Sequence, residues 1–144
     1  MSRTEVQAFF ETYRDAFNRL DGDAVADLWH TPSAITNTRS AEATAQLTLW
    51  PDDVPMRANH RALCEIYRGN GYQHANFEIV DCIGLGAHHA FANLHWTLWR
   101  DDGSLPQDFR TGYNLLRTAA GPKVVLVTQY EEDIARMRLN HAAE

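Results

Sequence analysis

Residues His89 to Tyr130 read HAFANLHWTLWRDDGSLPQDFRTGYNLLRTAAGPKVVLVTQY. The first part, Phe91 to Trp99, alternates between two faces with a period of two, which is typical of a β-strand. Asp101-Asp102-Gly103 then predicts a tight turn. A second strand from about Phe109 to Arg117, a turn at Gly121-Pro122 and a third strand from Val124 to Tyr130 complete the stretch. It therefore predicts three consecutive antiparallel strands.

The two faces of the first strand differ in their chemistry. Leu94, Trp96 and Leu98 make one face uniformly apolar, whereas the opposite face mixes the aromatic Phe91 and Trp99 with polar side chains. A sheet with two largely dry faces needs cover on both sides. We therefore expect the apolar face to pack on a large, flat partner and the mixed face to line a partly polar cavity.

Composition restricts the class of protein. The chain has 144 residues, enough for one domain with a substantial core, so residues 1–144 are taken as a single domain. A formal net charge of -6 without a Lys/Arg cluster argues against binding to nucleic acid, because phosphate contacts dominate that affinity. No apolar run is long enough to span a membrane, and no apolar signal segment follows Met1. Neither Cys64 nor Cys82 belongs to a Cys-x-x-Cys pair, so we expect free thiols and a cytoplasmic location.

The segments before this stretch predict mostly helices. Residues 4–20 place their apolar side chains at spacings of three and four, with Ser2/Glu5 and Thr4/Gln7 as competing capping boxes. A shorter helix is expected from Asp21 through Trp29, ended by Pro32. A third helix begins near Asp52 and ends at Gly69-Asn70-Gly71.

The remaining segments give weaker signals. Residues 33–37 and 77–83 alternate like strands, and residues 131–144 predict a polar helix or tail. Residues 38–55 show little pattern, which fits a functional lid, a loop or an extra hairpin. Because a run of strands follows the helices, the fold class is α+β. We expect a curved, mostly antiparallel sheet wrapped around the N-terminal helices, forming a cone-shaped barrel with one internal pocket.

Two stretches carry a resemblance to a known superfamily. They are Phe10-Glu-Thr-Tyr-Arg-Asp-Ala-Phe-Asn18, followed by Gly22-Asp23, Ala26, Leu28 and Trp29, and the terminal Gly121-Pro-Lys-Val-Val-Leu-Val-Thr-Gln-Tyr130. With the order of elements, they resemble the nuclear-transport-factor-2-like superfamily, including its SnoaL-like (polyketide-cyclase-like) and ketosteroid-isomerase-type members. The resemblance implies a deep apolar pocket and a homodimer through the sheet face that carries Leu94, Trp96 and Leu98.

The ketosteroid isomerases of this superfamily provide a template for the site. Those enzymes use a carboxylate base, together with a tyrosine and a protonated acid that hold the enolate oxygen. Tyr13 matches the tyrosine, and the second donor falls on Tyr113 or, with a register shift of one residue, on Asn114. The position of the base is Asn37, and an amide is not a general base at neutral pH. The chain therefore lacks the base for steroid-type isomerisation.

A set of polar and aromatic residues remains for binding or catalysis. If the strand alternation holds, Asn93, His95, Thr97 and Gln129 point into the cone. Histidine is the side chain that titrates nearest neutrality, so His95 is the first candidate for a general acid or base; the alternative is a core histidine bonded to Tyr13 or Asn93. Tyr13 and Tyr113 would then donate hydrogen bonds to a developing oxyanion. The expected ligand-binding residues are Phe17, Trp29, Asn37, His60, Asn93, Thr97 and Gln129.

No metal site or cofactor is expected. His89 and His95 share a strand face but lie roughly 20 Å apart, too far to bind one ion together. We hypothesise that the chain binds a small, apolar organic molecule. It would act either as a cofactor-free isomerase, dehydratase or cyclase by proton transfer, or as a non-catalytic ligand-binding or protein-association dimer. The sequence leaves open whether the chain is an enzyme.

Overall fold

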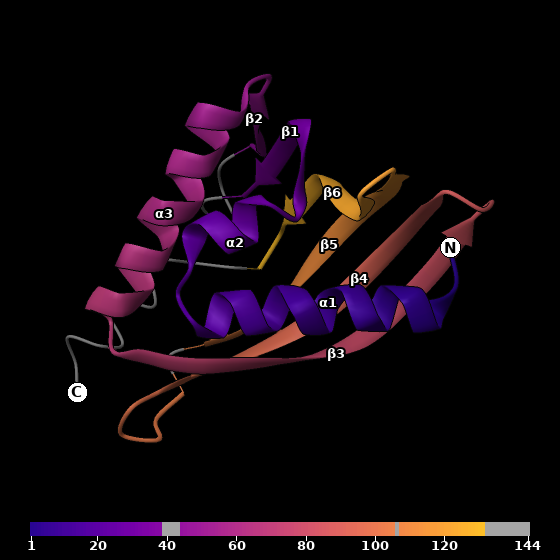
Figure 1. The fold of residues 1–144 in the computed structure, drawn as a ribbon. Coiled ribbons are helices and arrows are strands. Elements are labelled where there is room, and N and C mark those ends of the chain that lie inside the picture. Colours follow the sequence, from indigo (N-terminus) through magenta and orange to yellow (C-terminus); the bar gives the residue numbers. More distant parts are fainter. Residues whose placement is uncertain (39–43, 106, 132–144) are drawn as a thin grey trace.

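The computed structural model describes residues 1–38, 44–105 and 107–131. The described residues form an α+β fold in which three helices lie against a curved, open sheet of six strands (Figure 1). The helices are α1 (Arg3–Asn18), α2 (Gly22–Ala26) and α3 (Asp53–Gly69). The strands are β1 (Trp29–Asn37), β2 (Gln46–Trp50), β3 (Tyr72–Leu85), β4 (His89–Arg100), β5 (Gln107–Thr118) and β6 (Gly121–Gln129).

The sheet has the order β2-β1-β6-β5-β4-β3. Strands β3 to β6 form a continuous antiparallel meander, as the alternation of the sequence predicts. The first strand, β1, pairs parallel with the last strand, β6, and antiparallel with β2. The part of the sheet made by β1 and β2 therefore joins the meander through residues that are far apart in the sequence.

Helix α1 covers one face of the meander, which we call the inner face (Figure 1). Its N-terminus is capped by Ser2, whose Oγ accepts a hydrogen bond of 3.2 Å from the backbone N–H of Glu5, so the Ser2/Glu5 capping box is the one that forms. The apolar stripe of α1, which includes Val6, Phe10 and Tyr13, is buried. This stripe supplies the apolar cover that a sheet face needs.

The inner face includes Leu94, Trp96 and Leu98, and this corrects the predicted dimer face. These side chains are only 0%, 5% and 2% exposed within a single copy of the chain, so they are not available to a second copy. The mixed face of β4, which carries Asn93, His95 and Thr97, is the outer face of the sheet and is half-buried. The orientation is reversed because α1 of the same chain already provides the large apolar partner.

Side chains from α1 form hydrogen bonds with the free edge of β3. The amide of Asn18 accepts hydrogen bonds from the Tyr72 hydroxyl at 2.6 Å and from the backbone N–H of Ala75 at 2.7 Å. The same amide donates to the carbonyl of Ala75 at 3.1 Å, and Arg3 donates to the carbonyl of Ile79 at 3.3 Å. These contacts occupy backbone groups that an edge strand otherwise leaves open to another chain.

Two further predictions concern the region between α1 and α3, and a third concerns the C-terminal residues. The second helix ends at Ala26, and Trp29 and Pro32 belong to β1, so the helix predicted through Trp29 is too long. The β1–β6 pairing is irregular between Trp29 and Ala34, which is where a strand tolerates a proline. Within residues 38–55, β2 forms the extra hairpin with β1. The helix or tail expected over 131–144 lies, apart from Glu131, outside the described residues.

Candidate functional site

A cavity lies between α1, α3 and the inner face of the sheet, with a solvent-accessible volume of about 60 Å³. That is several times the space that one water molecule requires. Seven aromatic side chains line it: Tyr13, Phe17, Trp29, Tyr67, Trp96, Phe109 and Tyr113. The aliphatic lining is Ile35, Leu63, Ala75, Leu98 and Val127, and the polar lining is Asn59, His60, Thr111 and Gln129. Among the described residues, no Asp, Glu, Lys or Arg side chain lines the cavity.

His60 is the buried histidine of this cavity. It lies on the inward side of α3, between Met56 and Tyr67, and is 3% exposed. Its ring packs on the indole of Trp29, with 4.5 Å between the ring centroids. Neither Nδ1 nor Nε2 has a hydrogen-bond partner among the described residues. Burial lowers the pKa of His60 to about 4, so the ring is neutral at pH 7.

A row of polar residues crosses the sheet at one end of the cavity. Asn37 on β1, Gln129 on β6 and Thr111 on β5 are successive partners in the strand register. The buried Oδ1 of Asn37 and Oγ1 of Thr111 have no hydrogen-bond partner within the described ranges. Together with His60, these atoms make up most of the buried side-chain polar groups without a partner, and an unpaired group of this kind costs free energy that a ligand can recover.

The two tyrosines predicted to act on a ligand both line the cavity, and each is paired with a tryptophan. The Tyr13 hydroxyl accepts a hydrogen bond from Trp29 Nε1 at 3.2 Å, and the Tyr113 hydroxyl accepts one from Trp96 Nε1 at 2.9 Å. The ring centroids of Tyr13 and Tyr113 are 6.0 Å apart. Tyr113, and not Asn114, is thus the inward residue of β5, because it pairs with the buried Ala92.

Helix α3, which carries His60, is held against α2 by close packing. A Cβ atom on Gly22 would lie 2.7 Å from Arg61 Cα and 2.8 Å from Arg61 N, so only glycine allows this approach. The contact is with the backbone of His60 and Arg61. It therefore restricts how far α3, and with it His60, can move relative to α2.

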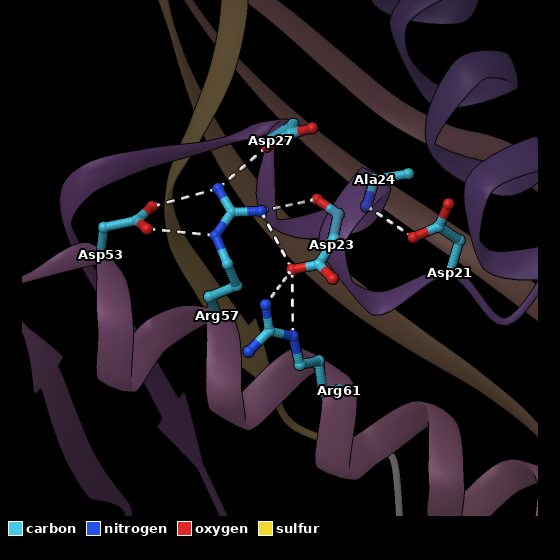
Figure 2. Close-up of polar contacts among 7 residues, drawn as sticks. All are labelled: Asp21, Asp23, Ala24, Asp27, Asp53, Arg57 and Arg61. Atoms are coloured by element: carbon cyan, nitrogen blue, oxygen red, sulfur yellow. Dashed lines mark hydrogen bonds and ion pairs between the residues drawn. The ribbon is translucent and has the colours of Figure 1, made fainter.

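Charged groups surround the same junction (Figure 2). Arg57 donates hydrogen bonds to the carboxylates of Asp23 at 3.3 Å, Asp27 at 2.9 Å and Asp53 at 3.1 and 3.2 Å, and Arg61 donates to Asp23 at 2.7 and 3.0 Å. The hydrogen bonds from Arg61 and Arg57 hold the pKa of Asp23 below its usual range, and those from Arg57 do the same for Asp53. The cluster joins α3 to α2 and its C-cap, and so positions the helix.

The structure brings six of the predicted site residues to the cavity and places four elsewhere. Tyr13, Tyr113, Phe17, Trp29, His60 and Gln129 line it, and Asn37 lies next to Gln129 on the same face. His95, Asn93 and Thr97 are on the outer face and do not line the cavity, so the expectation that they point into the cone is wrong. On that face, His95 Nε2 lies 3.7 Å from Asp108 Oδ1, and Asn93 bonds to Asp81 and Tyr130.

Several residues that line the cavity were not predicted from the sequence. Thr111 could have been found, because it stands two residues before Tyr113 on the same strand and therefore shares its face. Leu63 and Tyr67 lie three and seven residues after His60, which puts them on one side of α3. Trp96 and Leu98 were missed because the faces of β4 were assigned in reverse.

Other kinds of site find no support in the described part of the chain. It contains no group of three or more His, Cys, Asp or Glu side chains arranged to hold a metal ion. None of its helices combines the length and apolarity needed to cross a membrane. Both cysteines are free, and burial raises the pKa of Cys64 to about 11, so its thiol is protonated at neutral pH.

Solved structures share this fold at low sequence identity. A domain of unknown function with a cystatin-like fold from Nostoc punctiforme has a TM-score of 0.69 and 11% identity over 99% of this chain and 86% of its own. An NTF-2 like protein of unknown function from Shewanella oneidensis has a TM-score of 0.68 and 12% identity over 91% of this chain and 100% of its own. A ketosteroid isomerase-like protein from Erwinia carotovora atroseptica has a TM-score of 0.59 and 16% identity over 89% and 94%.

The sequence itself identifies the family. No curated protein matches the chain. A family model described as NTF2-like protein (DUF6841) matches residues 4–132, which include every described helix and strand apart from the first residue of α1. The α+β fold, with its curved, open and mostly antiparallel sheet and its N-terminal helices, agrees with that match. This chain belongs to the NTF2-like proteins of the DUF6841 family.

Proposed function

We propose that this protein binds a small, largely apolar organic molecule in the cavity between α1, α3 and the inner sheet face. The observation that carries the proposal is a cavity walled by seven aromatic rings, with no charged lining among the described residues and with unpaired buried polar atoms on His60 and Thr111. Such a lining, apolar with a few polar groups, is typical of small-molecule sites. Ligand binding requires no reactive group, so the lining of this cavity supports binding better than it supports catalysis.

The test is native mass spectrometry of freshly purified protein, followed by titration with small aromatic compounds under tryptophan fluorescence. We expect a bound small molecule or a saturable change in emission, because Trp29 and Trp96 line the cavity. Leu63→Trp fills the cavity and should abolish binding, whereas Leu126→Trp, at a half-buried outer position, should not. Failure of every compound to bind the wild-type protein would overturn the proposal.

Proton transfer without a cofactor is the second candidate function, as an isomerase, dehydratase or cyclase. Tyr13 and Tyr113 support it, because each hydroxyl accepts an indole hydrogen bond and each residue lines the cavity, where a hydroxyl could stabilise an oxyanion. The available base is weak, since His60 has a pKa of about 4 and a general base works best near the ambient pH. Deuterium uptake by a small cyclic ketone in heavy water would reveal the activity, and Tyr13→Phe should lower it.

Association with a second copy is compatible with either function. A row of register partners crosses the outer face from Leu49 on β2 through Ala34, Leu126, Asn114 and Phe91 to Ile83 on β3. Leu47, Leu49, Ile83 and Leu85 are 66%, 63%, 53% and 52% exposed. Exposed apolar surface of this extent marks an interaction surface, and it supports a homodimer through the outer face.

A further inference from the structure

His60 presents a hydrogen-bonding pattern that restricts which ligands the cavity can hold. A neutral imidazole has one N–H donor and one bare nitrogen that accepts. In His60 both nitrogens are buried without a partner among the described residues, and the ring packs on the indole of Trp29. A carbonyl or ether oxygen on a ligand could pair with the N–H only. The bare nitrogen requires a ligand that donates a hydrogen bond.

The rest of the cavity restricts the charge of that ligand. No ionised side chain lines it in the described part of the chain, and the guanidinium of Arg57 on α3 is engaged by Asp23, Asp27 and Asp53 (Figure 2). A carboxylate or an ammonium group would therefore be buried without a counter-ion, which is costly. The seven aromatic rings favour a flat ring as the apolar part of the ligand.

We propose that the cavity selects uncharged ring compounds that carry a hydroxyl group, and that the hydroxyl hydrogen-bonds to the ring of His60. The hydroxyl donates its proton in a hydrogen bond to the bare imidazole nitrogen, and its oxygen can accept from a second donor. Thr111, whose buried hydroxyl has no partner in the described ranges and which lines the same cavity, supplies such a donor. This inference rests on the proposed ligand-binding function and specifies its ligand class.

The experiment compares ligands of similar size that differ in one property, by two-dimensional NMR titration of the ¹⁵N-labelled protein at pH 7. The neutral ligands are phenol, which donates and accepts, anisole, which only accepts, and toluene, which does neither. Benzoate and benzylammonium add a charge of either sign. We expect phenol to bind about tenfold more tightly than toluene, as one net hydrogen bond allows, and the charged compounds to bind more weakly than toluene.

Two variants locate the selectivity. His60→Leu should reduce the preference for phenol over toluene to less than twofold. His95→Leu, the same substitution on the outer face, should leave the tenfold preference intact. If His60→Leu does not fold, His60→Phe serves in its place; its ring has no hydrogen-bonding nitrogen, so the preference should fall in the same way, and an unchanged tenfold preference would overturn the inference. Loss of the preference in His95→Leu would overturn the inference.

A second readout does not depend on any variant. The imidazole ¹⁵N shifts of His60 should move on addition of phenol and not on addition of toluene, because only phenol makes a hydrogen bond to the ring. Equal binding of phenol, anisole and toluene would overturn the hydroxyl requirement while leaving the ligand-binding function standing. If benzoate or benzylammonium bound more tightly than toluene, the requirement for an uncharged ligand would be overturned. Absence of binding by all five compounds would count against both proposals.

Discussion

Asn18 fastens the C-terminal end of α1 to the edge of the sheet. Its amide makes three hydrogen bonds, two of them to the backbone of Ala75 and one to the Tyr72 hydroxyl. Substitution by alanine would leave these partly buried groups without partners. Because unpaired buried groups cost free energy, Asn18 alone has a large effect on the contact between α1 and β3.

Asn18→Ala should therefore lower the free energy of unfolding by about 2–3 kcal/mol. Urea denaturation followed by circular dichroism measures the change. Gln7→Ala is the control, because Gln7 lies on the exposed side of the same helix and, among the described residues, its side chain bonds to Glu11 alone, so its loss should change stability by less than about 0.5 kcal/mol. Equal effects of the two substitutions would show that Asn18 does not hold the edge.

His60 should make the protein less stable in mild acid. Its pKa in the folded state is about 4, below the ordinary value of 6.5 that applies to the unfolded chain. Between these values the unfolded state binds the extra proton, so the free energy of unfolding falls as the pH drops from 6.5 toward 4. The contribution of His60 amounts to about 2 kcal/mol between pH 7 and pH 5.

Urea denaturation at pH 7 and at pH 5 measures this loss. His60→Leu should remove about 2 kcal/mol of the difference between the two pH values. The carboxylates of Asp23 and Asp53 have lowered pKa values and so contribute at still lower pH, outside the tested range. An unchanged pH dependence in His60→Leu would contradict the burial-lowered pKa.

The junction of α2 and α3 depends on one glycine. Gly22→Ala places a methyl group against the backbone of Arg61, which cannot move as a flexible side chain would, so α2 must shift away from α3. We expect a loss of about 2–3 kcal/mol from this overpacking. Gly69→Ala, in the last turn of α3 with nothing within 4 Å of the new methyl group, should be neutral or stabilising by up to about 1 kcal/mol. Thermal denaturation of the pair distinguishes close packing from a general intolerance of the helices to substitution.

At the level of elements, the periodicity of the sequence was sufficient to predict the helices and strands that depend on local contacts. The spacing of Val6, Phe9, Phe10 and Tyr13 predicts α1, and the alternation of Phe91 to Trp99 predicts β4. Alternation defines two faces, but it does not say which face the rest of the chain covers. That choice depends on α1, whose apolar stripe occupies the face of Leu94 and Trp96 and so turns His95 outward.

Part of the site was predictable from the patterns of α1, α3 and β6, and the family resemblance added Tyr113 on β5. Tyr13, Phe17, His60 and Gln129 follow from those patterns. The neutral state of His60 does not, because it arises from desolvation by groups that come from different elements. Trp29 packs on the ring from β1, and that contact requires the parallel pairing of β1 with β6, which no local pattern encodes.

For the whole molecule, we expect a homodimer through the outer sheet face, with twice the chain mass of 16.4 kDa. Leu49→Asp should convert it to a monomer, because Leu49 lies in the apolar row that crosses the outer face and a buried unpaired charge opposes association. Val54→Asp is the control, since Val54 is 77% exposed on α3 and away from the sheet. Light scattering after gel filtration gives the mass, and a monomeric wild-type protein would refute the expectation.

The parallel pairing of β1 with β6 also determines when, during synthesis, β1 and β2 can join the rest of the sheet. During synthesis the hairpin of β1 and β2 leaves the ribosome long before Gly121–Gln129, so it must wait for almost the entire chain before it can join the sheet. Contacts between distant segments of this kind form late and slow the folding reaction. Trp29 and Ile35 reach the cavity only when that seam closes, so the cavity is complete only after β6 has been made.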